Sequence, residues 1–412
     1  MKTNIRDFTQ TNGSTALTLE LDALVVGVGF SGMYLLHELR KLGLKSVIFE
    51  AWSDVGGTWK TWNWSSNYFD HITQVLDIRK DCAFNTVVVG AEFDQKSGRW
   101  HVTTQDSRRA TANHLGKIDH SSFWPETGVD MRGKRVAVVG TGASGVQLTQ
   151  ALGPVAGSLT VFQRSPNYAL PTHRRALTVE EQERLKPLYP QLCRLRETGF
   201  AGFLYTFSEK VLPQNSPEEQ ERVFQALYKG GGFRYTLATY KDGKREIFLR
   251  QKNSPYVFGG KRLSLEIDYF EQFNRRNVQL VDFSEKAIST SGGLMDMGLR
   301  SVHGTSLRDD WNDSVLSYLG LTISGYLNLF FLYSPHGPTA ICNGPSAIEV
   351  QGRWIVDAIK LMERSGIRSI DPTPEAVRGW KDKINALSNM TLFPTVKTST
   401  LMGGNVPGKP VE

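Results

Sequence analysis

The pattern of apolar residues near the start of the chain predicts one β–α–β unit. An apolar run at 21–26 ends at a glycine, as a strand buried on both faces does when it enters a tight turn. Residues 32–42 follow with leucines at helical spacing, and Gly43 stands where a helix cap belongs. A second apolar run at 46–49 ends at Glu50 and completes the unit.

A second unit of the same kind lies further along the chain. Apolar runs at 135–139 and 159–162 flank a helix-prone segment at 143–152. Residues 177–250 are charged, helix-prone and interrupted by prolines, which predicts a helical elaboration of this unit. Apolar residues at helical spacing predict a further helix over 352–365. The predicted fold class is therefore α/β, with two Rossmann-like dinucleotide-binding domains and a helical elaboration in the second.

The most apolar stretch of the chain, 315–334, is long enough to span a bilayer, but polar and turn-prone residues interrupt it. Two strands around a turn at Ser324–Gly325 are the better interpretation, so we expect no stable membrane insertion. Residues 1–20 are polar, carry no pattern of a secretory signal and are predicted to be a loose leader.

The strand–helix turn of the first unit has the spacing Gly-x-Gly-x-x-Gly, which binds the pyrophosphate of a dinucleotide. Gly27 permits the tight turn, Gly29 lets the backbone approach a phosphate, and Gly32 lets the helix pack close to the strand. Glu50 ends the second strand, where a carboxylate can accept hydrogen bonds from a ribose diol. The segment Gly57-Thr58-Trp59 follows soon after and can wrap a flavin's pyrophosphate and ring, although a loop with a packed tryptophan is the alternative.

The turn of the second unit repeats this spacing at Gly140, Gly142 and Gly145. The strand after it ends at Arg164 instead of at an acid, and a guanidinium suits a 2′-phosphate. The second site therefore favours NADPH over NADH, with a solvated surface arginine as the alternative. Two dinucleotide sites in one chain suggest that electrons pass between them. Besides the glycines, the residues assigned to the second nucleotide are Thr141, Ser144, Arg164 and Ser165.

Composition narrows the possible partners. The 412 residues are enough for two or three domains, and the net charge is +7. Lys and Arg are scattered, so polyanionic cofactors account for the excess and no nucleic-acid partner is expected. The cysteines Cys82, Cys193 and Cys342 have no metal-ligand spacing and indicate a reducing, cytoplasmic compartment.

A short signature between the two units carries a family resemblance. Gly116, His120, Trp124 and Pro125 match the pattern F-x-G-x-x-x-H-x-x-x-W followed by Pro or Asp, with His114 in place of the leading Phe. The chain thus resembles the Baeyer–Villiger monooxygenases, flavoproteins that insert one oxygen atom beside a ketone carbonyl. The resemblance runs from about residue 21 to residue 410.

The resemblance implies roles for residues in the matched segments. The stretch 260–269 is similar to the family segment that carries an active-site arginine, here Arg262. His120 would help to position the second domain, although a structural histidine is the alternative. Gly57-Thr58-Trp59 matches a flavin-binding segment of the family, and the match at 342–345 assigns Asn343 to a cofactor site.

The resemblance also implies the chemistry. It indicates an enzyme that uses FAD, NADPH and O₂ to convert a ketone into an ester or lactone, without a metal. Arg262 would stabilise negative charge that develops on the reacting oxygens. Two alternatives remain: a flavin monooxygenase that oxygenates nitrogen or sulfur, and a non-catalytic NADPH-binding or redox-sensing protein. Neither the ketone nor the oligomeric state follows from the sequence.

Several family segments are missing. The segment Tyr-Pro-Gly-Ala-Arg-Cys-Asp, whose aspartate partners the active-site arginine, is absent after Trp64, and two Ala-Thr-Gly segments are absent as well. The family's final strand and loop are also absent. We therefore expect weak flavin retention and poor turnover of ketones. The predicted domains are 1–130 (first part of the FAD-binding domain), 131–255 (NADPH-binding domain with helical insert) and 256–412 (return to the FAD-binding domain).

Overall fold

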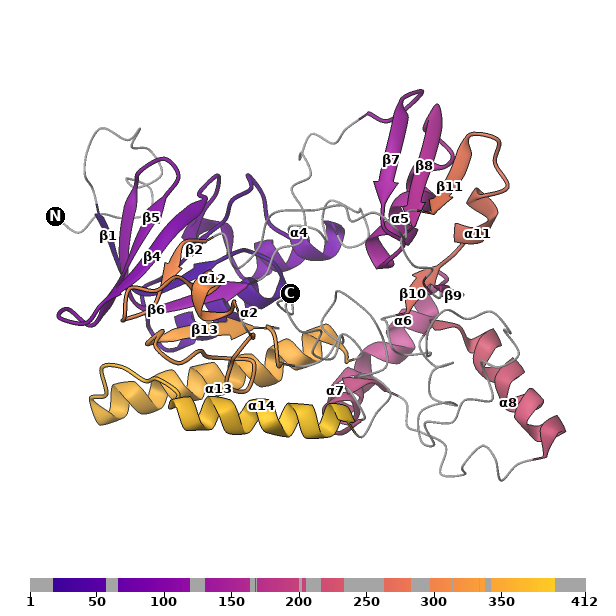
Figure 1. The fold of residues 1–412 in the computed structure, drawn as a ribbon. Helices are drawn as coiled ribbons and strands as arrows, with labels where there is room; N and C mark the ends of the chain where they lie inside the picture. The colour runs from indigo at the N-terminus through magenta and orange to yellow at the C-terminus, as the bar shows by residue number, and fades with distance from the viewer. Residues whose placement is uncertain are drawn as a thin grey trace.

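The computed structural model shows two β–α units of unequal size, connected by extended and helical segments (Figure 1). The first unit combines strands from the N-terminal part of the chain with helices from the C-terminal part. The structure describes residues 18–56, 66–118, 130–163, 167, 169–199, 202–204, 216–232, 263–282, 297–312, 314–332, 334–337 and 342–389.

The larger sheet belongs to the first unit and contains eight strands within the described residues. Its central strand, β1, pairs in parallel with β2 on one side and β6 on the other, and β4, β5 and β6 form an antiparallel meander. The strands are β1 (Thr18–Val26), β2 (Ser46–Phe49), β3 (Cys82–Ala83), β4 (Val88–Asp94), β5 (Arg99–Thr104), β6 (Arg109–Ile118), β12 (Leu299–Arg300) and β13 (Leu329–Leu332).

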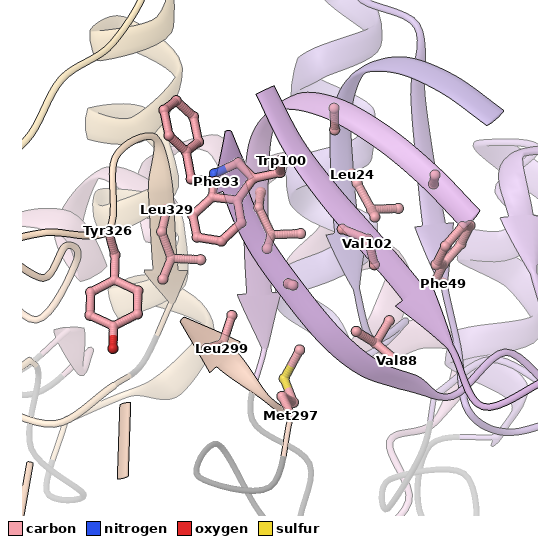
Figure 2. Packing of buried hydrophobic residues seen from close by; sticks show 14 of the residues in the cluster. Leu24, Phe49, Val88, Phe93, Trp100, Val102, Met297, Leu299, Tyr326 and Leu329 are labelled. Carbon is pink, nitrogen blue, oxygen red and sulfur yellow. The ribbon is translucent and has the colours of Figure 1, made fainter. Parts of the chain in front are cut away.

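Apolar side chains fill both faces of this sheet, as a largely parallel sheet requires. Leu24 and Trp100 lie on one face, in a cluster that also draws on residues 297–331 (Figure 2). Ala23 and Val25 point to the other face, where α2 and α13 pack. The helices of this unit are α2 (Phe30–Lys41), α4 (Ser66–Val75), α12 (Leu307–Asp310), α13 (Gly344–Ser365) and α14 (Pro374–Asn389).

The second unit has its own small core. Its described strands form a parallel sheet in the order β11-β8-β7, and Val138, Leu159 and Val161 pack with Leu152 of α5. A separate parallel ribbon of β9 and β10 packs beside α5. The elements are β7 (Arg135–Val139), α5 (Ala143–Leu152), β8 (Ser158–Gln163), β9 (Ala169–Pro171), β10 (Ser264–Glu266), α11 (Tyr269–Gln272) and β11 (Val278–Asp282).

Most of the predicted elements are confirmed. Both β–α–β units form, and the predicted helical elaboration appears as separate helices between residues 177 and 250. The helix expected over 352–365 begins earlier, at Gly344, because Asn343 caps it and Pro345 fits its first turn. The helices of the elaboration are α6 (Val179–Leu185), α7 (Tyr189–Thr198) and α8 (Pro217–Gly230).

Two predictions differ from the structure. Among the described residues of the apolar stretch 315–334, only β13 is a strand; the earlier half turns at Gly320, which has φ +65°, and forms a single bridge between Tyr318 and Thr322. The predicted return to the first domain at residue 256 is too early. β10 and β11 pair with β9 and β8, so the second unit extends at least to Asp282.

Asn328 joins three parts of the chain at the start of β13. Its Nδ2 donates to the carbonyl oxygens of Asn113 and Arg368, each 2.9 Å away. Its Oδ1 accepts the N–H of Ile370 at 3.0 Å. The residue is buried and has φ +57°, which asparagine tolerates better than most residues. This one side chain therefore fixes β13 against β6 and against the segment that follows α13.

His114 lies buried on β6, beside Phe330, with 6.2 Å between the ring centroids. Its Nδ1 makes no hydrogen bond within the described part of the chain. Burial lowers the pKa of the imidazole to about 4, and the charge of Asp22 opposes this shift. The folded protein therefore holds His114 neutral at pH values where a histidine of an unfolded chain accepts a proton.

Asn328→Gly is expected to destabilise the protein by about 3 kcal/mol, because two part-buried carbonyls and one part-buried N–H lose their partner. Glycine adopts the positive φ without strain, so the loss reports on the amide. Urea unfolding measures the effect, with Asn274→Gly, at an exposed asparagine, as the control for the added chain entropy. A difference from the control of less than about 1 kcal/mol would contradict this role.

Acid is expected to destabilise the protein partly through His114. Between the ordinary pKa of 6.5 and the lowered value of about 4, the unfolded chain binds a proton that the folded chain does not, so stability falls as the pH falls. From pH 7 to pH 5 this group costs about 2 kcal/mol. Urea unfolding at pH 7 and pH 5 measures the effect. The free energy of unfolding of His114→Phe should fall by about 2 kcal/mol less between the two pH values than that of the unsubstituted protein. Equal losses in the two proteins would disprove the role of His114.

Candidate functional site

The first glycine turn connects β1 to α2. Gly27 has φ +99°, a conformation that favours glycine, whereas Gly29 has φ −75° and carries no backbone strain. The N–H of Gly27 donates to the carbonyl of Phe49 at 2.8 Å, so the turn is tied to the end of β2. The predicted placement of Gly27, Gly29 and Gly32 between a strand and a helix start is what the structure shows.

The carboxylate of Glu50 is built into this turn. Glu50 is buried, and its Oε2 accepts the N–H of Val28 at 2.7 Å while Oε1 accepts the N–H of Trp52 at 2.9 Å. A buried carboxylate is stable only when it is hydrogen-bonded, and each of its oxygens can accept more than one hydrogen bond. Glu50 therefore shapes the turn, and its oxygens keep the acceptor capacity that the predicted contact to a ribose needs.

Both turns lead into helices that lack a side-chain cap. Neither Gly29 at the start of α2 nor Gly142 at the start of α5 offers a capping oxygen, and neither helix has an acidic residue in its first turn. The N–H groups of a first helical turn have no intrahelical partner and attract anions. Five other described helices satisfy such groups with a side chain: α6 with Thr178, α8 with Ser216, α12 with Ser306, α13 with Asn343 and α14 with Thr373.

Open space lies in front of both uncapped helices. A Cβ added at Gly29 or at Gly142 would meet no protein atom within 4 Å. At Gly145, by contrast, an added Cβ would lie 2.0 Å from the carbonyl oxygen of Gly140. The first kind of glycine leaves room for a bound group, and the second kind lets the helix pack on the strand. These residues fit the pyrophosphate of a dinucleotide at each turn.

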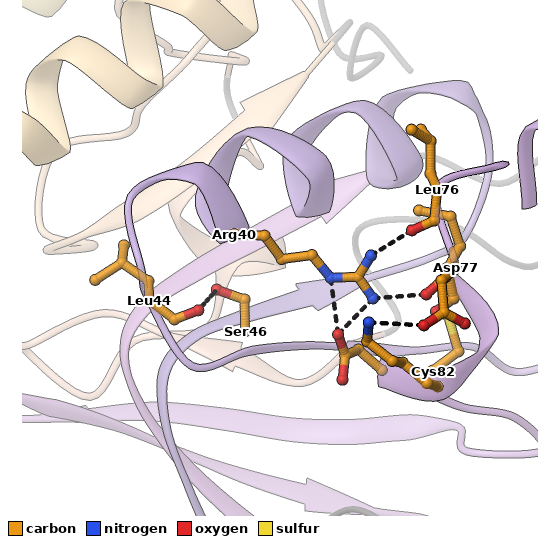
Figure 3. Close-up of polar contacts among 9 residues, drawn as sticks. Arg40, Leu44, Ser46, Leu76, Asp77 and Cys82 are labelled. Carbon is orange, nitrogen blue, oxygen red and sulfur yellow. Dashed lines mark hydrogen bonds and ion pairs between the residues drawn. The ribbon is translucent and has the colours of Figure 1, made fainter.

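Helix α2 is also anchored at its far end (Figure 3). Arg40 Nη1 donates to the carbonyl of Leu76 at 2.7 Å, Nη2 donates to the carbonyl of Asp77 at 2.9 Å, and Nε donates to Asp81 Oδ2 at 2.8 Å. Nearby, burial raises the pKa of the Cys82 thiol to about 12, so this cysteine is not a nucleophile. The helix that presents the first turn is thus held from both ends.

The second turn repeats the geometry of the first. Gly140 has φ +95°, and its N–H donates to the carbonyl of Phe162 at the end of β8, 2.8 Å away. Thr141, just before α5, is buried, whereas Ser144, in the first turn of α5, is exposed. Of the two, Ser144 lies on the surface that a nucleotide at α5 would reach.

Asn343 has a defined structural role. Its Oδ1 accepts the N–H of Ser346 at 3.1 Å and lies 3.0 Å from the Ser346 hydroxyl, so it caps α13. Its assignment to a cofactor stays a prediction. The remaining predicted site residues lie outside the described residues: Gly57, Thr58, Trp59, His120, Arg164, Ser165 and Arg262.

Ion pairs that no sequence pattern indicated connect the helical elaboration to the first unit. Arg196 Nη2 on α7 lies 2.5 Å from Glu349 Oε2 on α13, and Arg353 Nη1 lies 3.6 Å from Glu197 Oε1. Gly202 follows α7 and packs against the start of α13, so closely that a Cβ there would lie 2.8 Å from Ser346 Cβ. Partners about 150 positions apart, as Arg196 and Glu349 are, have no local signature.

The structure also bears on the predictions about metal ions, cysteines and membrane insertion. In the part of the chain that the structure describes, no group of His, Cys, Asp and Glu side chains could hold a metal ion. Cys82 is buried and Cys193 is exposed, and neither forms a disulfide. None of the described helices has the length and apolar composition needed to cross a membrane.

Comparisons with known proteins agree with this geometry. Residues 25–81 match the family described as NAD(P)-binding Rossmann-like domain. The chain is 44% identical to "FAD-binding monooxygenase acrE" of Aspergillus aculeatus over 524 positions, covering 100% of this chain and 88% of that protein. It is 32% identical to cyclopentanone 1,2-monooxygenase of a Comamonas species, covering 95% of this chain and 91% of that protein.

Solved structures give the same result. A steroid monooxygenase bound to NADP matches with a TM-score of 0.79 and 26% identity, covering 95% of each chain. A closed crystal structure of cyclohexanone monooxygenase matches with a TM-score of 0.80 and 26% identity, covering 92% of this chain and 91% of that one. The alignment with the Aspergillus protein is longer than the 412 residues of this chain, so some of its positions face gaps here.

Proposed function

This chain belongs to the Baeyer–Villiger monooxygenase family, and on that premise we propose that it oxidises a ketone to an ester or lactone with NADPH and O₂. The observation that carries the proposal is the pair of uncapped helix starts, each behind a glycine turn with open space before it. One dinucleotide site would serve a simple dehydrogenase. Two sites in one chain suit a reaction in which one nucleotide reduces the other.

We assign FAD to the first turn and NADPH to the second. Gly27, Gly29 and Gly32 would receive the FAD pyrophosphate at α2, and Glu50 would accept hydrogen bonds from its ribose. Gly57, Thr58 and Trp59 follow this unit in sequence and would complete the flavin site. When both are bound, NADPH supplies reducing equivalents and FAD supplies the chemistry that activates O₂.

The NADPH site would be formed by α5 and by the end of β8. Gly140, Gly142 and Gly145 shape the turn, with Thr141 and Ser144 beside it. Arg164 and Ser165 follow β8 directly in sequence, where a guanidinium can pair with the 2′-phosphate that distinguishes NADPH from NADH.

Two further residues are assigned by the family pattern. Arg262 would place positive charge beside the oxygen atoms that become negative during attack on the ketone, and this stabilisation is worth most in a site that excludes water. His120 follows β6 in sequence and would position the second unit relative to the first. We propose a cytoplasmic location as well, because isolated cysteines without metal-ligand spacing suit a reducing compartment.

The gaps in the alignment bear on how well this chain can catalyse the reaction. The aspartate that would orient Arg262 belongs to a segment that this chain lacks, and a displacement of about 1 Å can cost on the order of 10²-fold in rate. We therefore propose that the chain retains both nucleotide sites and the reaction class, with flavin held more weakly and with part of the NADPH consumed without ester formation.

Two glycine substitutions should separate the two cofactors. Gly29→Ala is expected to weaken FAD binding at least about tenfold and to leave NADPH binding unchanged, and Gly142→Ala should do the reverse. The added methyl group meets no protein atom in either case, so it can clash only with the bound nucleotide. Fluorescence titration with each cofactor measures both affinities, and circular dichroism confirms folding. Retention of FAD by Gly29→Ala would refute the first assignment.

The reaction itself is tested with purified protein, FAD, NADPH and a panel of cyclic and linear ketones. Ester or lactone is expected by gas chromatography, in an amount smaller than the NADPH consumed. Arg262→Ala should lower product formation by about 10²- to 10³-fold, whereas Arg276→Ala, at an exposed arginine, should not. Oxygenation of amines or sulfides without any ester would favour the other flavin monooxygenase class instead.

A further inference from the structure

Residues 263–282 run through β10, α11 and β11 in the unit that contains α5, the helix after the second glycine turn (Figure 1). β10 and α11 both pack on α5, and an added Cβ at Gly153 would come within 2.4 Å of Gln272 Oε1. Further along, Asn277 Nδ2 donates to the carbonyls of Gly153 and Ala156 at 3.0 and 2.9 Å. One continuous segment thus holds the second half of the helix.

A single side chain, Gln150, makes the first connection between α5 and this segment. Its Oε1 accepts the N–H of Ile267 at 2.7 Å and the N–H of Asp268 at 3.1 Å. Its Nε2 donates to the carbonyl of Val146, one turn earlier on α5, at 3.2 Å. The last bond fixes the orientation of the amide, so that the oxygen points at the two backbone donors.

The two donors lie where the chain leaves β10 and enters α11. Asp268 precedes α11 but makes no side-chain cap there, although the start of a helix leaves N–H groups without intrahelical partners. Glu266 Oε2 accepts the N–H of Tyr269 at 3.0 Å, and Gln150 supplies the acceptor for the two residues before it. A side chain of the nucleotide-binding helix therefore determines where β10 ends.

We propose that Gln150 is a positioning residue that couples a nucleotide bound at the second turn to β10. A nucleotide that restricts the motion of the start of α5 would also restrict Gln150, two turns later. Through its hydrogen bonds, Gln150 would then restrict the backbone of Ile267 and Asp268. Arg262 lies two residues before β10 in sequence, so the strand's position bears on where that arginine is held. The identity of the nucleotide, NADP(H), rests on the proposed function.

Hydrogen–deuterium exchange tests the coupling without turnover. Adding NADP⁺ to the full chain is expected to slow amide exchange in the peptide that contains Ile267 and Asp268. Gln150→Met keeps the length of the side chain but removes its acceptor, and exchange there should become about tenfold faster and insensitive to NADP⁺. Gln150→Glu keeps the acceptor oxygens but loses the donor to Val146, so it should restore part of the slow exchange. Gln182→Met, on the exposed face of α6, is the control.

A second measurement addresses catalysis. In protein loaded with FAD, Gln150→Met should lower the ester formed per NADPH consumed, while the KM for NADPH stays within about twofold, because the turn that binds the nucleotide is unchanged. Restoration of the ratio by Gln150→Glu would support positioning through the acceptor oxygen. An unchanged ratio in Gln150→Met, together with faster exchange, would show a purely structural role and overturn the proposal.

The exchange result also separates this inference from the proposed function. If the unsubstituted protein forms no ester but NADP⁺ still protects Ile267 and Asp268 through Gln150, the reaction assignment fails and the coupling stands. If NADP⁺ does not slow exchange at these amides in the unsubstituted protein, the coupling is wrong whatever the variants do.

Discussion

The first unit depends on a buried asparagine. β13 is far from β6 in sequence. The side chain of Asn328, at the start of β13, connects them through hydrogen bonds to Asn113, Arg368 and Ile370. A backbone group that loses water without gaining a partner costs free energy, and this amide supplies the partner for three part-buried groups. It also sets the register in which Leu329 pairs with Leu115. β6 pairs with β13 and also with β1, the strand that leads into the first glycine turn.

The two glycine turns share a backbone geometry but differ in what stabilises them. Gly27 and Gly140 both adopt a positive φ, and each N–H donates to the strand that returns after the helix. The first turn is reinforced by the buried carboxylate of Glu50, whereas the strand after the second turn leads to Arg164 in sequence. A carboxylate suits ribose hydroxyls and a guanidinium suits a phosphate, so in the proposed assignment one backbone motif would serve two nucleotides.

The sequence predicted what depends on local patterns. Apolar runs, glycine spacing and the acid at residue 50 located both β–α–β units, since each signal lies within a few residues of the structure it specifies. It did not predict Gln150, Arg196 or Asn328, whose partners lie far away in the chain. It also misjudged 315–334, because an apolar run predicts burial and cannot distinguish a buried strand from a buried loop closed by Ser317 and Ser334.

The second unit has a small apolar core within the described residues. Parallel sheets are normally covered on both faces, yet the described part of this sheet has α5 on one face, and Val139 on β7 is 52% exposed. A sheet with less apolar burial has less free energy to hold its neighbours in place. The contacts that remain around α5 then carry more of the positional accuracy that oxygen transfer requires. The positions of the elements around α5 are therefore expected to depend on polar side chains such as Gln150 and Asn277 rather than on a large core.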